Sequence, residues 1–276
     1  MSGLIDLHLH TTCSDGALPP ETLVAELAEA GVTVFAVTDH DTVAGVAPAR
    51  AAAEPLGLRI IPGAEMSVVH RGQDLHILAY FLDGDDPDVA ELLHRVRASR
   101  FDRMREMVAR LNGLGIPVSL DAVVARAADR LSVGRVHLAE ELVDRKWVDH
   151  YRDVFRYYLS DRGPAHVPKL TADAAETLQV LRRSGAVPVL AHPGAYVIDG
   201  LLEELVPAGL LGLEVYHPSH STAQQLEYRD LAKEWGLVVT GGSDFHGRHE
   251  NEARPGSLGL EESIVEALEN CRDENR

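Results

Sequence analysis

Cysteine is scarce in this chain. Only Cys13 and Cys271 occur among 276 residues, and they lie near opposite ends, so the sequence offers no disulfide framework. No apolar run approaches the length of a membrane span, and the first residues lack the basic-then-apolar pattern of a signal peptide. We therefore expect a protein of the reducing cytoplasm that has no membrane partner.

Basic residues are few relative to acidic ones. The chain has 26 lysines and arginines against 43 aspartates and glutamates, which gives a formal net charge of −17. This imbalance argues against stable binding of duplex DNA, because the phosphates of a duplex attract basic surfaces. It does not exclude a small phosphorylated substrate, since metal ions in a carboxylate-rich site reverse the sign of the local field.

The order of the expected elements indicates an α/β fold. Strands and helices alternate through the first eighty residues, residues 84–164 hold helices without a clear strand, and the alternation then resumes. The expected strands cover residues 4–10, 33–38, 58–61, 64–69, 75–80, 187–191, 212–216 and 237–240, with a turn at Pro62-Gly63. The expected helices cover residues 20–30, 44–53, 86–114, 120–128, 135–145, 150–159, 171–184, 198–205, 222–235 and 261–268. We predict a barrel domain built from 1–83 and 165–276, with 84–164 as a helical insertion packed over one face.

Histidines and acids gather at the ends of the expected strands. In the first strand Asp6, His8 and His10 share one face, although an H-x-H pair alone is a weak motif. Other strand ends carry the further residues His40, His192, His217, Asp244 and His246. Parallel strands of a barrel bring such residues to one mouth. Imidazole and carboxylate without a thiolate cluster suit manganese, zinc or iron, and so many ligands suggest two or three ions bridged by Glu65.

Five sequence blocks together resemble the PHP (polymerase and histidinol phosphatase) family. The blocks are Asp6-Leu7-His8-Leu9-His10, Thr38-Asp39-His40-Asp41, Gly63-Ala64-Glu65-Met66-Ser67, Ala191-His192-Pro193 and Gly242-Ser243-Asp244-Phe245-His246. The resemblance covers almost the whole chain. It implies a distorted seven-stranded (β/α) barrel that binds up to three divalent ions, with the insertion over the active-site face.

The resemblance also implies which side chains hold the ions. The first ion would be held by His8, His10, Glu65 and Asp244, and the second by Glu65, His76 and His192. The third would be held by Asp15, His40 and His246. Some relatives carry a histidine in place of Asp15, and a carboxylate there makes a harder, more manganese-like site. Manganese is the preferred ion, with zinc or iron as alternatives. His217 and Asp6 are expected to orient the ligands rather than to bind an ion.

Blocks in and after the insertion narrow the resemblance to one branch. They are Gly134-Arg135-Val136-His137-Leu138-Ala139, Ala165-His166-Val167-Pro168-Lys169 and His217-Pro218-Ser219-His220-Ser221. They look like the nucleoside 3′,5′-bisphosphate phosphatases, a branch that includes the 5′→3′ exoribonuclease ribonuclease AM. The implied reaction is hydrolysis of the 3′-phosphate by a metal-bridging hydroxide, together with 5′→3′ trimming of short single-stranded RNA. Histidinol-phosphate phosphatase and a non-catalytic PHP accessory module are the alternatives.

Roles for single residues follow from the same resemblance. The residues expected to take part in catalysis are Glu65, Asp244 and His220, and those expected to contact substrate are Arg100, Arg135, His137, Lys169 and His220. A guanidinium such as that of Arg135 can grip a phosphate with two parallel hydrogen bonds. Two alternatives stay open, namely an ion pair of Arg135 with Glu140 or Glu141 and a solvated position for Lys169. The oligomeric state is not predicted.

Overall fold

One mixed sheet forms the centre of the protein. The computed structural model describes residues 3–82, 84–127, 133–160, 162–168, 172–198, 200–248 and 250–275. The strands are β1 (Leu4–Asp6), β2 (Val32–Val37), β3 (Arg59–His70), β4 (Gln73–Tyr80), β5 (Ala172–Asp173), β6 (Val187–Leu190), β7 (Gly212–Tyr216) and β8 (Val238–Gly241). Their order in the sheet is β1-β2-β3-β4-β6-β7-β8, and the short β5 pairs with β3.

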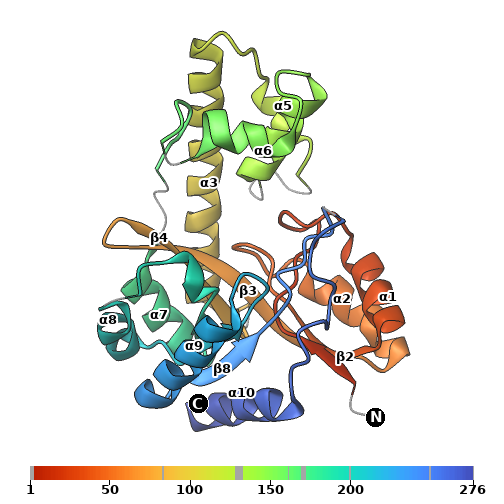
Figure 1. The fold of residues 1–276 in the computed structure, drawn as a ribbon, viewed down its shortest axis with the longest axis vertical. Helices are drawn as coiled ribbons and strands as arrows, with labels where there is room; N and C mark the ends of the chain where they lie inside the picture. Colours follow the sequence, from red (N-terminus) through yellow and green to blue (C-terminus); the bar gives the residue numbers. More distant parts are fainter. Residues whose placement is uncertain are drawn as a thin grey trace.

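The sheet curls so that its first and last strands approach each other (Figure 1). The neighbouring strands are parallel, except that β4 runs antiparallel to both β3 and β6. Between the two ends, Leu7 N donates to Gly241 O at 3.3 Å and Asp244 N donates to His8 O at 3.0 Å. These bonds replace a continuous ladder, so the sheet is a distorted, incompletely closed barrel. The predicted α/β class is confirmed.

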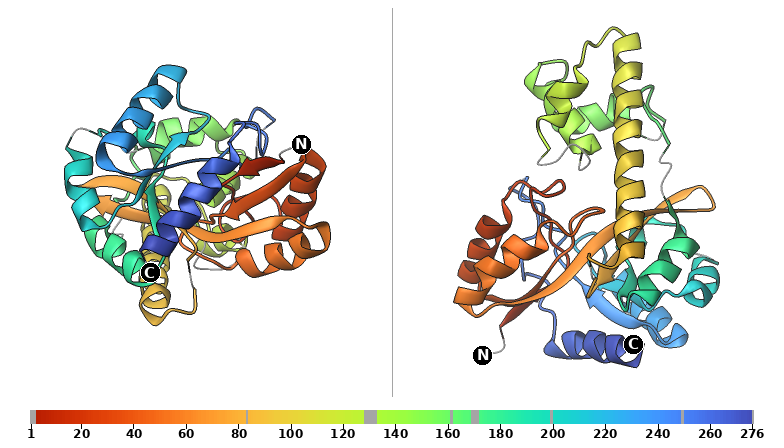
Figure 2. Two further views of the ribbon diagram at one scale, coloured as in Figure 1. Left: turned by 90° about the horizontal axis from the view of Figure 1, so that it is seen from below. Right: turned by 180° about the vertical axis from the view of Figure 1, so that it is seen from behind.

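Helices cover the outside of the sheet (Figures 1 and 2). They are α1 (Pro20–Ala30), α2 (Val46–Ala53), α3 (Pro87–Gly113), α4 (Leu120–Val124), α5 (Arg135–Asp144), α6 (Tyr151–Val154), α7 (Ala174–Arg183), α8 (Leu201–Ala208), α9 (Thr222–Trp235) and α10 (Glu262–Glu274). Short helical turns lie at η1 (Glu54–Leu56), η3 (Phe155–Leu159) and η4 (Pro193–Ala195). Helices α1 and α2 flank β2, whereas α7, α8 and α9 flank the later strands. No helix among the described residues is long and apolar enough to cross a membrane.

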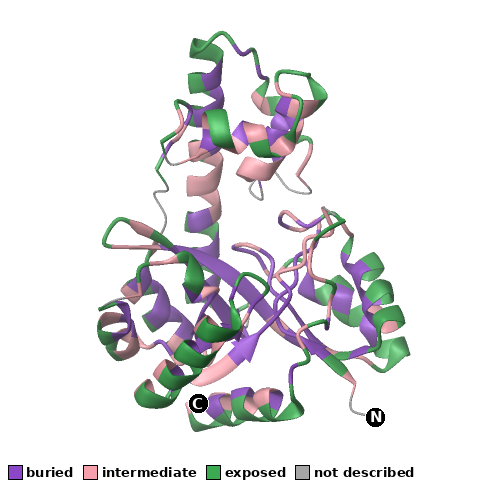
Figure 3. Ribbon diagram, in the orientation of Figure 1, coloured by how far each residue is buried: buried purple, intermediate pink, exposed green. Residues whose placement is uncertain are grey.

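The interior of the sheet is apolar at one end and polar at the other. Ile5, Ile61 and Val189 pack there against Val265 and Leu268 of α10, which lies across this end (Figures 1 and 3). Burial of these side chains removes apolar area from water, the dominant favourable contribution to folding. The candidate metal ligands lie beyond this apolar layer, where the parallel strands end.

The insertion is carried by the long helix α3 and has a core of its own. Helix α3 begins at the carboxylate of Asp86, which accepts hydrogen bonds from Asp88 N at 3.0 Å and Val89 N at 3.1 Å. Its first turns pack into the barrel core through Val89 and Leu92. Its later turns join a separate core made by α4, α5, α6 and the segment that returns to the barrel. The division of the chain at residues 84 and 164 therefore stays a prediction, because α3 belongs to both cores.

Several predicted boundaries are wrong. Helix α4 ends at Val124, short of the predicted end at residue 128, and residues 172–173 of the predicted helix 171–184 form β5. Helix α8 covers Leu201–Ala208 in place of the predicted 198–205. The expected turn at Pro62-Gly63 does not interrupt β3; Pro62 pairs with Val37 in parallel register, and its carbonyl accepts a hydrogen bond from Leu82 N at 3.3 Å. The first strand, predicted to reach residue 10, ends at Asp6. Beyond Asp6 isolated backbone hydrogen bonds, such as the one from His10 N to Phe245 O at 3.0 Å, replace the continuous strand pairing. Helix α10 continues past residue 268 because its apolar face still packs at Cys271.

Candidate metal centre

The carboxylate of Glu65 lies at the centre of a buried group of histidines. Glu65 is on β3, and its side chain is 1% exposed. Its Oε2 atom is 3.4 Å from His8 Nε2, 3.3 Å from His10 Nε2 and 3.1 Å from His40 Nδ1. One carboxylate oxygen thus faces three imidazoles that come from the ends of two strands.

The second carboxylate oxygen of Glu65 faces two further histidines. Its Oε1 atom is 2.7 Å from His76 Nδ1 and 3.0 Å from His192 Nε2. His192 follows β6, but His76 lies inside β4, the strand that runs antiparallel to its neighbours. Glu65 therefore has the position expected of a bridge between two ions.

Asp244 completes the group around His8 and His10. Its Oδ1 atom is 3.3 Å from His8 Nε2 and 3.2 Å from His10 Nε2. The backbone of Asp244 has φ 52°, a left-handed conformation that a non-glycine residue rarely adopts, and His192 has φ 29°. Strain of this kind tends to persist at functional sites, where the surrounding structure holds it.

A third group forms around Asp15 in the loop after β1. Asp15 Oδ1 is 3.6 Å from His10 Nδ1 and 3.4 Å from His246 Nε2, and Asp15 Oδ2 is 3.7 Å from His40 Nε2. Here His10 is near the three side chains predicted for the third ion. The prediction had placed it only at the first.

The donor atoms of these side chains fit divalent metal ions. Three groups have donor atoms within 4.8 Å of one another: His8, His10, Glu65 and Asp244; His40, Glu65 and His76; and His10, Asp15, His40 and His246. Among the described residues, the buried atoms His8 Nε2, His10 Nδ1, His10 Nε2 and His40 Nδ1 have no hydrogen-bond partner. A buried polar atom left in this state costs about 1–3 kcal/mol. Coordination to an ion would satisfy each of these nitrogens, and the assignment of ligands to particular ions stays a prediction.

Burial and neighbouring charges shift the pKa values of the cluster residues in opposite directions. Burial raises the pKa of Glu65, but the imidazoles of His40 and His76 hold that pKa well below its usual range. Burial lowers the pKa of His10, whereas the nearby carboxylates of Asp244 and Glu65 raise it to about 10. Because only neutral imidazole ligates a metal, metal ions and protons compete for these nitrogens.

A buried carboxylate that the sequence analysis missed supports two of the histidines. Glu214 Oε1 is 2.9 Å from His8 Nδ1, and Glu214 Oε2 accepts a hydrogen bond from His192 N at 2.6 Å. A carboxylate on the far nitrogen of a ligating histidine fixes the ring and makes it more basic. The signal in the sequence was a charged residue inside the apolar strand Gly-Leu-Glu-Val-Tyr, because a buried charge requires a partner.

Two more aspartates hold the backbone that carries the ligands. Asp6, expected to orient ligands, accepts hydrogen bonds from His8 N at 3.2 Å, Ser243 N at 3.0 Å and Gly256 N at 2.8 Å. Asp39 accepts hydrogen bonds from Thr11 N at 2.7 Å and from Ser14 Oγ at 2.6 Å, which fixes the loop before Asp15. The ligand positions are thus set by buried side-chain hydrogen bonds as well as by the strands.

A cavity of about 130 Å³ lies between the cluster and the insertion. It is lined by Asp15, His40, His76, Arg100, Arg103, Met104, Met107, Val133, Gly134, Arg135, Val136 and Phe155. Arg100 of α3 is fixed at the barrel side, where its Nε atom pairs with Asp41 and its Nη2 atom donates to Ser67 Oγ at 2.8 Å. Three candidate metal ligands and three arginines therefore line one cavity.

Comparison with known proteins decides the family. Residues 6–159, more than half of the chain, match the model of the PHP domain. The chain belongs to the PHP family. A solved structure from Bifidobacterium adolescentis, assigned as a metal-dependent phosphoesterase, has 30% sequence identity and a TM-score of 0.90, covering 99% of this chain and 97% of that one.

Curated PHP relatives cover most of the chain. A 3′,5′-nucleoside bisphosphate phosphatase of Chromobacterium violaceum is 34% identical over 247 residues, 88% of this chain and 87% of its own. A phosphoribosyl 1,2-cyclic phosphate 1,2-diphosphodiesterase of Eggerthella lenta is 32% identical over 246 residues, 88% and 94% of the two chains. The 5′-3′ exoribonuclease Rnm of Escherichia coli is 34% identical over 250 residues, 88% and 85% of the two chains.

Two of the predicted substrate contacts, His137 and His220, lie differently from Arg100 and Arg135, which line the cavity of this PHP protein. His137 is buried, its Nδ1 atom accepts a hydrogen bond from Gly134 N at 2.9 Å, and burial with nearby Arg248 lowers its pKa to about 4. His220 Nδ1 lies 2.9 Å from Val215 O, and His220 Nε2 accepts from Gly194 N at 3.2 Å. The geometry of both rings favours positioning the backbone, and their contact with substrate stays a prediction. Lys169 lies outside the described residues.

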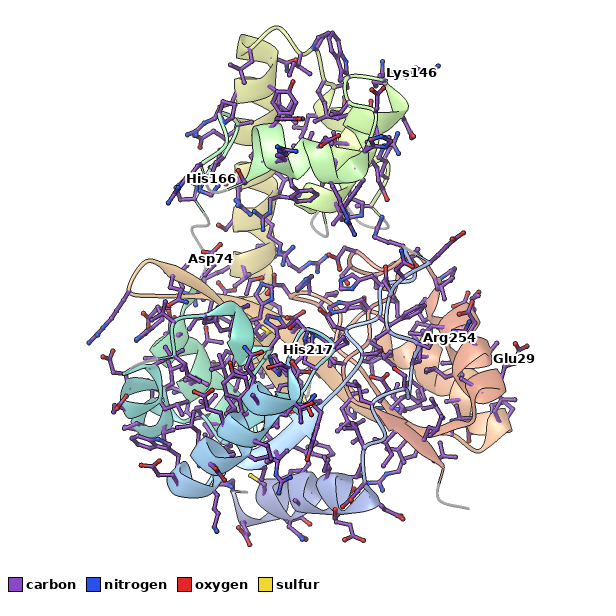
Figure 4. The ribbon with its side chains drawn as sticks, in the orientation of Figure 1. Glu29, Asp74, Lys146, His166, His217 and Arg254 are labelled. Atoms are coloured by element: carbon purple, nitrogen blue, oxygen red, sulfur yellow. The ribbon has the colours of Figure 1, made fainter. Side chains whose placement is uncertain are left out.

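His217 reaches the cluster from the loop after β7 (Figure 4). Its Nε2 atom lies 3.4 Å from Asp244 Oδ2, and its Nδ1 atom lies 2.7 Å from Ser219 Oγ. It contacts a candidate ligand from outside the three groups of donor atoms, and its orienting role stays a prediction.

Replacing Glu214 by glutamine is expected to weaken manganese binding about ten- to hundredfold while the fold is kept. The amide has the size of the carboxylate but lacks the charge that polarises the imidazole of His8. Isothermal calorimetry with the metal-free protein measures the affinity, and Glu227→Gln on the exposed face of α9 is a matched control. Unchanged manganese affinity in Glu214→Gln would show that this carboxylate does not support the ligands.

Proposed function

We propose that this PHP-family phosphoesterase removes the 3′-phosphate from nucleoside 3′,5′-bisphosphates, such as adenosine 3′,5′-bisphosphate, and trims short single-stranded RNA from its 5′ end. One observation carries the proposal: a single cavity is lined by the candidate metal ligands Asp15, His40 and His76 and by an arginine wall, defined as Arg100, Arg103 and Arg135. A substrate with two phosphates suits such a cavity, with one phosphate at the ions and the other at the guanidinium groups. The phosphatase and exoribonuclease relatives support the same substrate class.

The residues of the cluster would hold two to three divalent ions, with manganese preferred over zinc or iron. When bound, such ions make water acidic enough to attack at neutral pH and stabilise the charge on the attacked phosphate. Glu65 and Asp244 supply the negative charge that holds the ions, and their low pKa values keep them ionised at neutral pH. Glu214 holds the ring of His8 through the 2.9 Å contact to its Nδ1 atom, which leaves Nε2 for an ion.

The start of α5 supports a phosphate at the arginine wall. Its first turn contains no acidic side chain, and Gly134 at the N-cap has no side chain that could cap the N–H groups of this turn. Such N–H groups and the positive end of the helix dipole attract anions. Arg135 is the first residue of the helix and lines the same cavity, and its fork of N–H donors matches a phosphate. Glu140 pairs with Arg248 and Glu141 with Arg126 and Arg145, whereas Arg135 Nη1 lies 3.5 Å from Leu159 O.

Arg135→Ala is expected to raise KM for adenosine 3′,5′-bisphosphate about a hundredfold, and Arg135→Lys about tenfold, with a smaller change in kcat. A lysine keeps the charge but cannot make two parallel hydrogen bonds to one phosphate. Steady-state kinetics measure the effect, and Arg145→Ala at the other end of α5 is the control. A KM for Arg135→Ala within twofold of the wild type would remove this residue from the phosphate site.

Histidinol phosphate fits the cavity less well. That substrate carries an ammonium group, which the three arginines of the cavity would repel. The cyclic diester named for the Eggerthella relative is a further substrate to compare. A non-catalytic accessory module would not need a complete set of ligand groups, whereas this chain brings three such groups together.

Comparison of kcat/KM in the presence of manganese tests the proposed substrate. We expect adenosine 3′,5′-bisphosphate to exceed both histidinol phosphate and phosphoribosyl 1,2-cyclic phosphate by at least about tenfold, a difference of 1.4 kcal/mol in transition-state binding. A higher value for histidinol phosphate would overturn the assignment in favour of that activity. Hydrolysis of none of these substrates, nor of a short 5′-phosphorylated oligoribonucleotide, would favour the accessory-module alternative.

A further inference from the structure

The side chain of Arg248 connects two parts of the molecule that lie on opposite sides of the cavity. Arg248 is in the loop after β8, two residues beyond His246, and its side chain is only 13% exposed. Its Nε atom donates to the backbone carbonyl of Asp15, in the loop that supplies a candidate ligand. Its Nη1 atom pairs with Glu140 Oε1 on α5 of the insertion.

The backbone around Arg248 is itself held in place. The carboxylate of Glu252 accepts hydrogen bonds from the N–H groups of His246, Gly247 and Arg248, each at 2.8 Å. The same loop is also bonded to the loop after β1, because His246 O accepts a hydrogen bond from Ala17 N at 2.7 Å. Because this loop is fixed by several bonds, the guanidinium extends from a rigid base and can transmit a constraint.

The insertion needs such a constraint because its own core does not include the loops of the metal centre. Leu138, Ala139 and Leu142 of α5 pack into the core of the insertion, which is separate from the cores of the barrel. Helix α5 nevertheless supplies Arg135 to the cavity, facing Asp15. Helix α3 belongs to both cores, but among the described residues no apolar core includes both α5 and the Asp15 loop. The placement of α5 over that loop therefore depends on α3 and on polar contacts across the cavity.

We propose that Arg248 is a positioning residue that couples the two halves of the substrate site. One guanidinium holds α5, and with it Arg135, over the cluster, and the same group fixes the Asp15 loop. A displacement of either side then displaces the other. The expected effects of this role on kinetics rest on the proposed function, whereas its expected effects on structure do not.

Hydrogen exchange and calorimetry on three variants separate the two contacts of Arg248. Arg248→Gln removes the charge and weakens both contacts, whereas Glu140→Gln weakens only the contact to α5. Arg145→Gln breaks a charged pair with Glu141 within α5 and is the matched control. Amide exchange of the metal-free proteins is compared over residues 135–140 and 11–17, and manganese affinity is measured by calorimetry.

We expect Arg248→Gln to speed exchange in both segments at least about tenfold, Glu140→Gln only in residues 135–140, and Arg145→Gln in neither. Manganese affinity should fall about tenfold in Arg248→Gln and stay unchanged in Glu140→Gln, whereas KM for the bisphosphate should rise about tenfold in both.

Unchanged exchange in both segments of Arg248→Gln would overturn the proposal. So would equal effects of Glu140→Gln and Arg145→Gln. If the variants show this exchange pattern but the wild type does not hydrolyse the bisphosphate, the inference about Arg248 is supported and the proposed function is wrong.

Discussion

Glu65→Gln is expected to lower manganese-dependent turnover by about a thousandfold or more, because its carboxylate is the element shared between the donor groups. Its two oxygens face His8, His10, His40, His76 and His192 at 2.7–3.4 Å. An amide in this position carries no charge and offers one acceptor oxygen in place of two. It cannot bridge two cations, so the loss should affect more than one ion.

Metal content and kinetics together test this expectation. Elemental analysis of manganese-loaded Glu65→Gln should show at least one ion fewer per chain than the wild type. Glu203→Gln, on the exposed side of α8, is the control for a loss of one surface charge and should match the wild type in both measurements. Wild-type metal content in Glu65→Gln would show that this carboxylate is not a ligand.

Asp244→Asn is expected to nearly abolish turnover while the fold stays intact, with a loss of about a thousandfold. Burial raises the pKa of Asp244, but His8, His10 and His217 hold it well below its usual range, so the native group is ionised at pH 7. Asparagine removes that charge from a point 3.2–3.3 Å from His8 Nε2 and His10 Nε2. It also tolerates the left-handed backbone at φ 52°, so the strained loop should keep its conformation.

Rate measurements and circular dichroism distinguish loss of chemistry from loss of structure. The spectrum of Asp244→Asn should coincide with that of the wild type, and the exposed substitution Asp230→Asn on α9 should leave both spectrum and rate unchanged. Full activity in Asp244→Asn would mean that the group formed with His8, His10 and Glu65 is assigned wrongly.

Local signals explain which elements were predictable from the sequence. The bounds of α1 and α9 were predicted correctly because each helix ends at a glycine in the left-handed region, Gly31 at φ 82° and Gly236 at φ 66°. The start of α3 was also predicted closely, since Asp86 and Pro87 are typical of a helix N-terminus. The Pro62-Gly63 turn was predicted wrongly because both residues favour turns, whereas pairing with β2 and β4 keeps the strand continuous.

Contacts between distant parts of the chain explain what the sequence could not reveal. The candidate ligands stood out because histidines and acids recur where strands end, and the fold brings them to one edge. Glu214 was missed because its partner His8 is 206 residues away, and no local pattern connects them. The link from Arg248 to Glu140 depends on the placement of the insertion, which the periodicity of its helices does not determine.

Phosphorus NMR of the reaction with adenosine 3′,5′-bisphosphate tests the central claim most directly. Protein freed of metal by a chelator should release no phosphate, and addition of manganese should yield inorganic phosphate and adenosine 5′-monophosphate. Release of phosphate without any divalent ion, or formation of adenosine 3′-monophosphate as the product, would contradict a metal centre that acts on the 3′-phosphate.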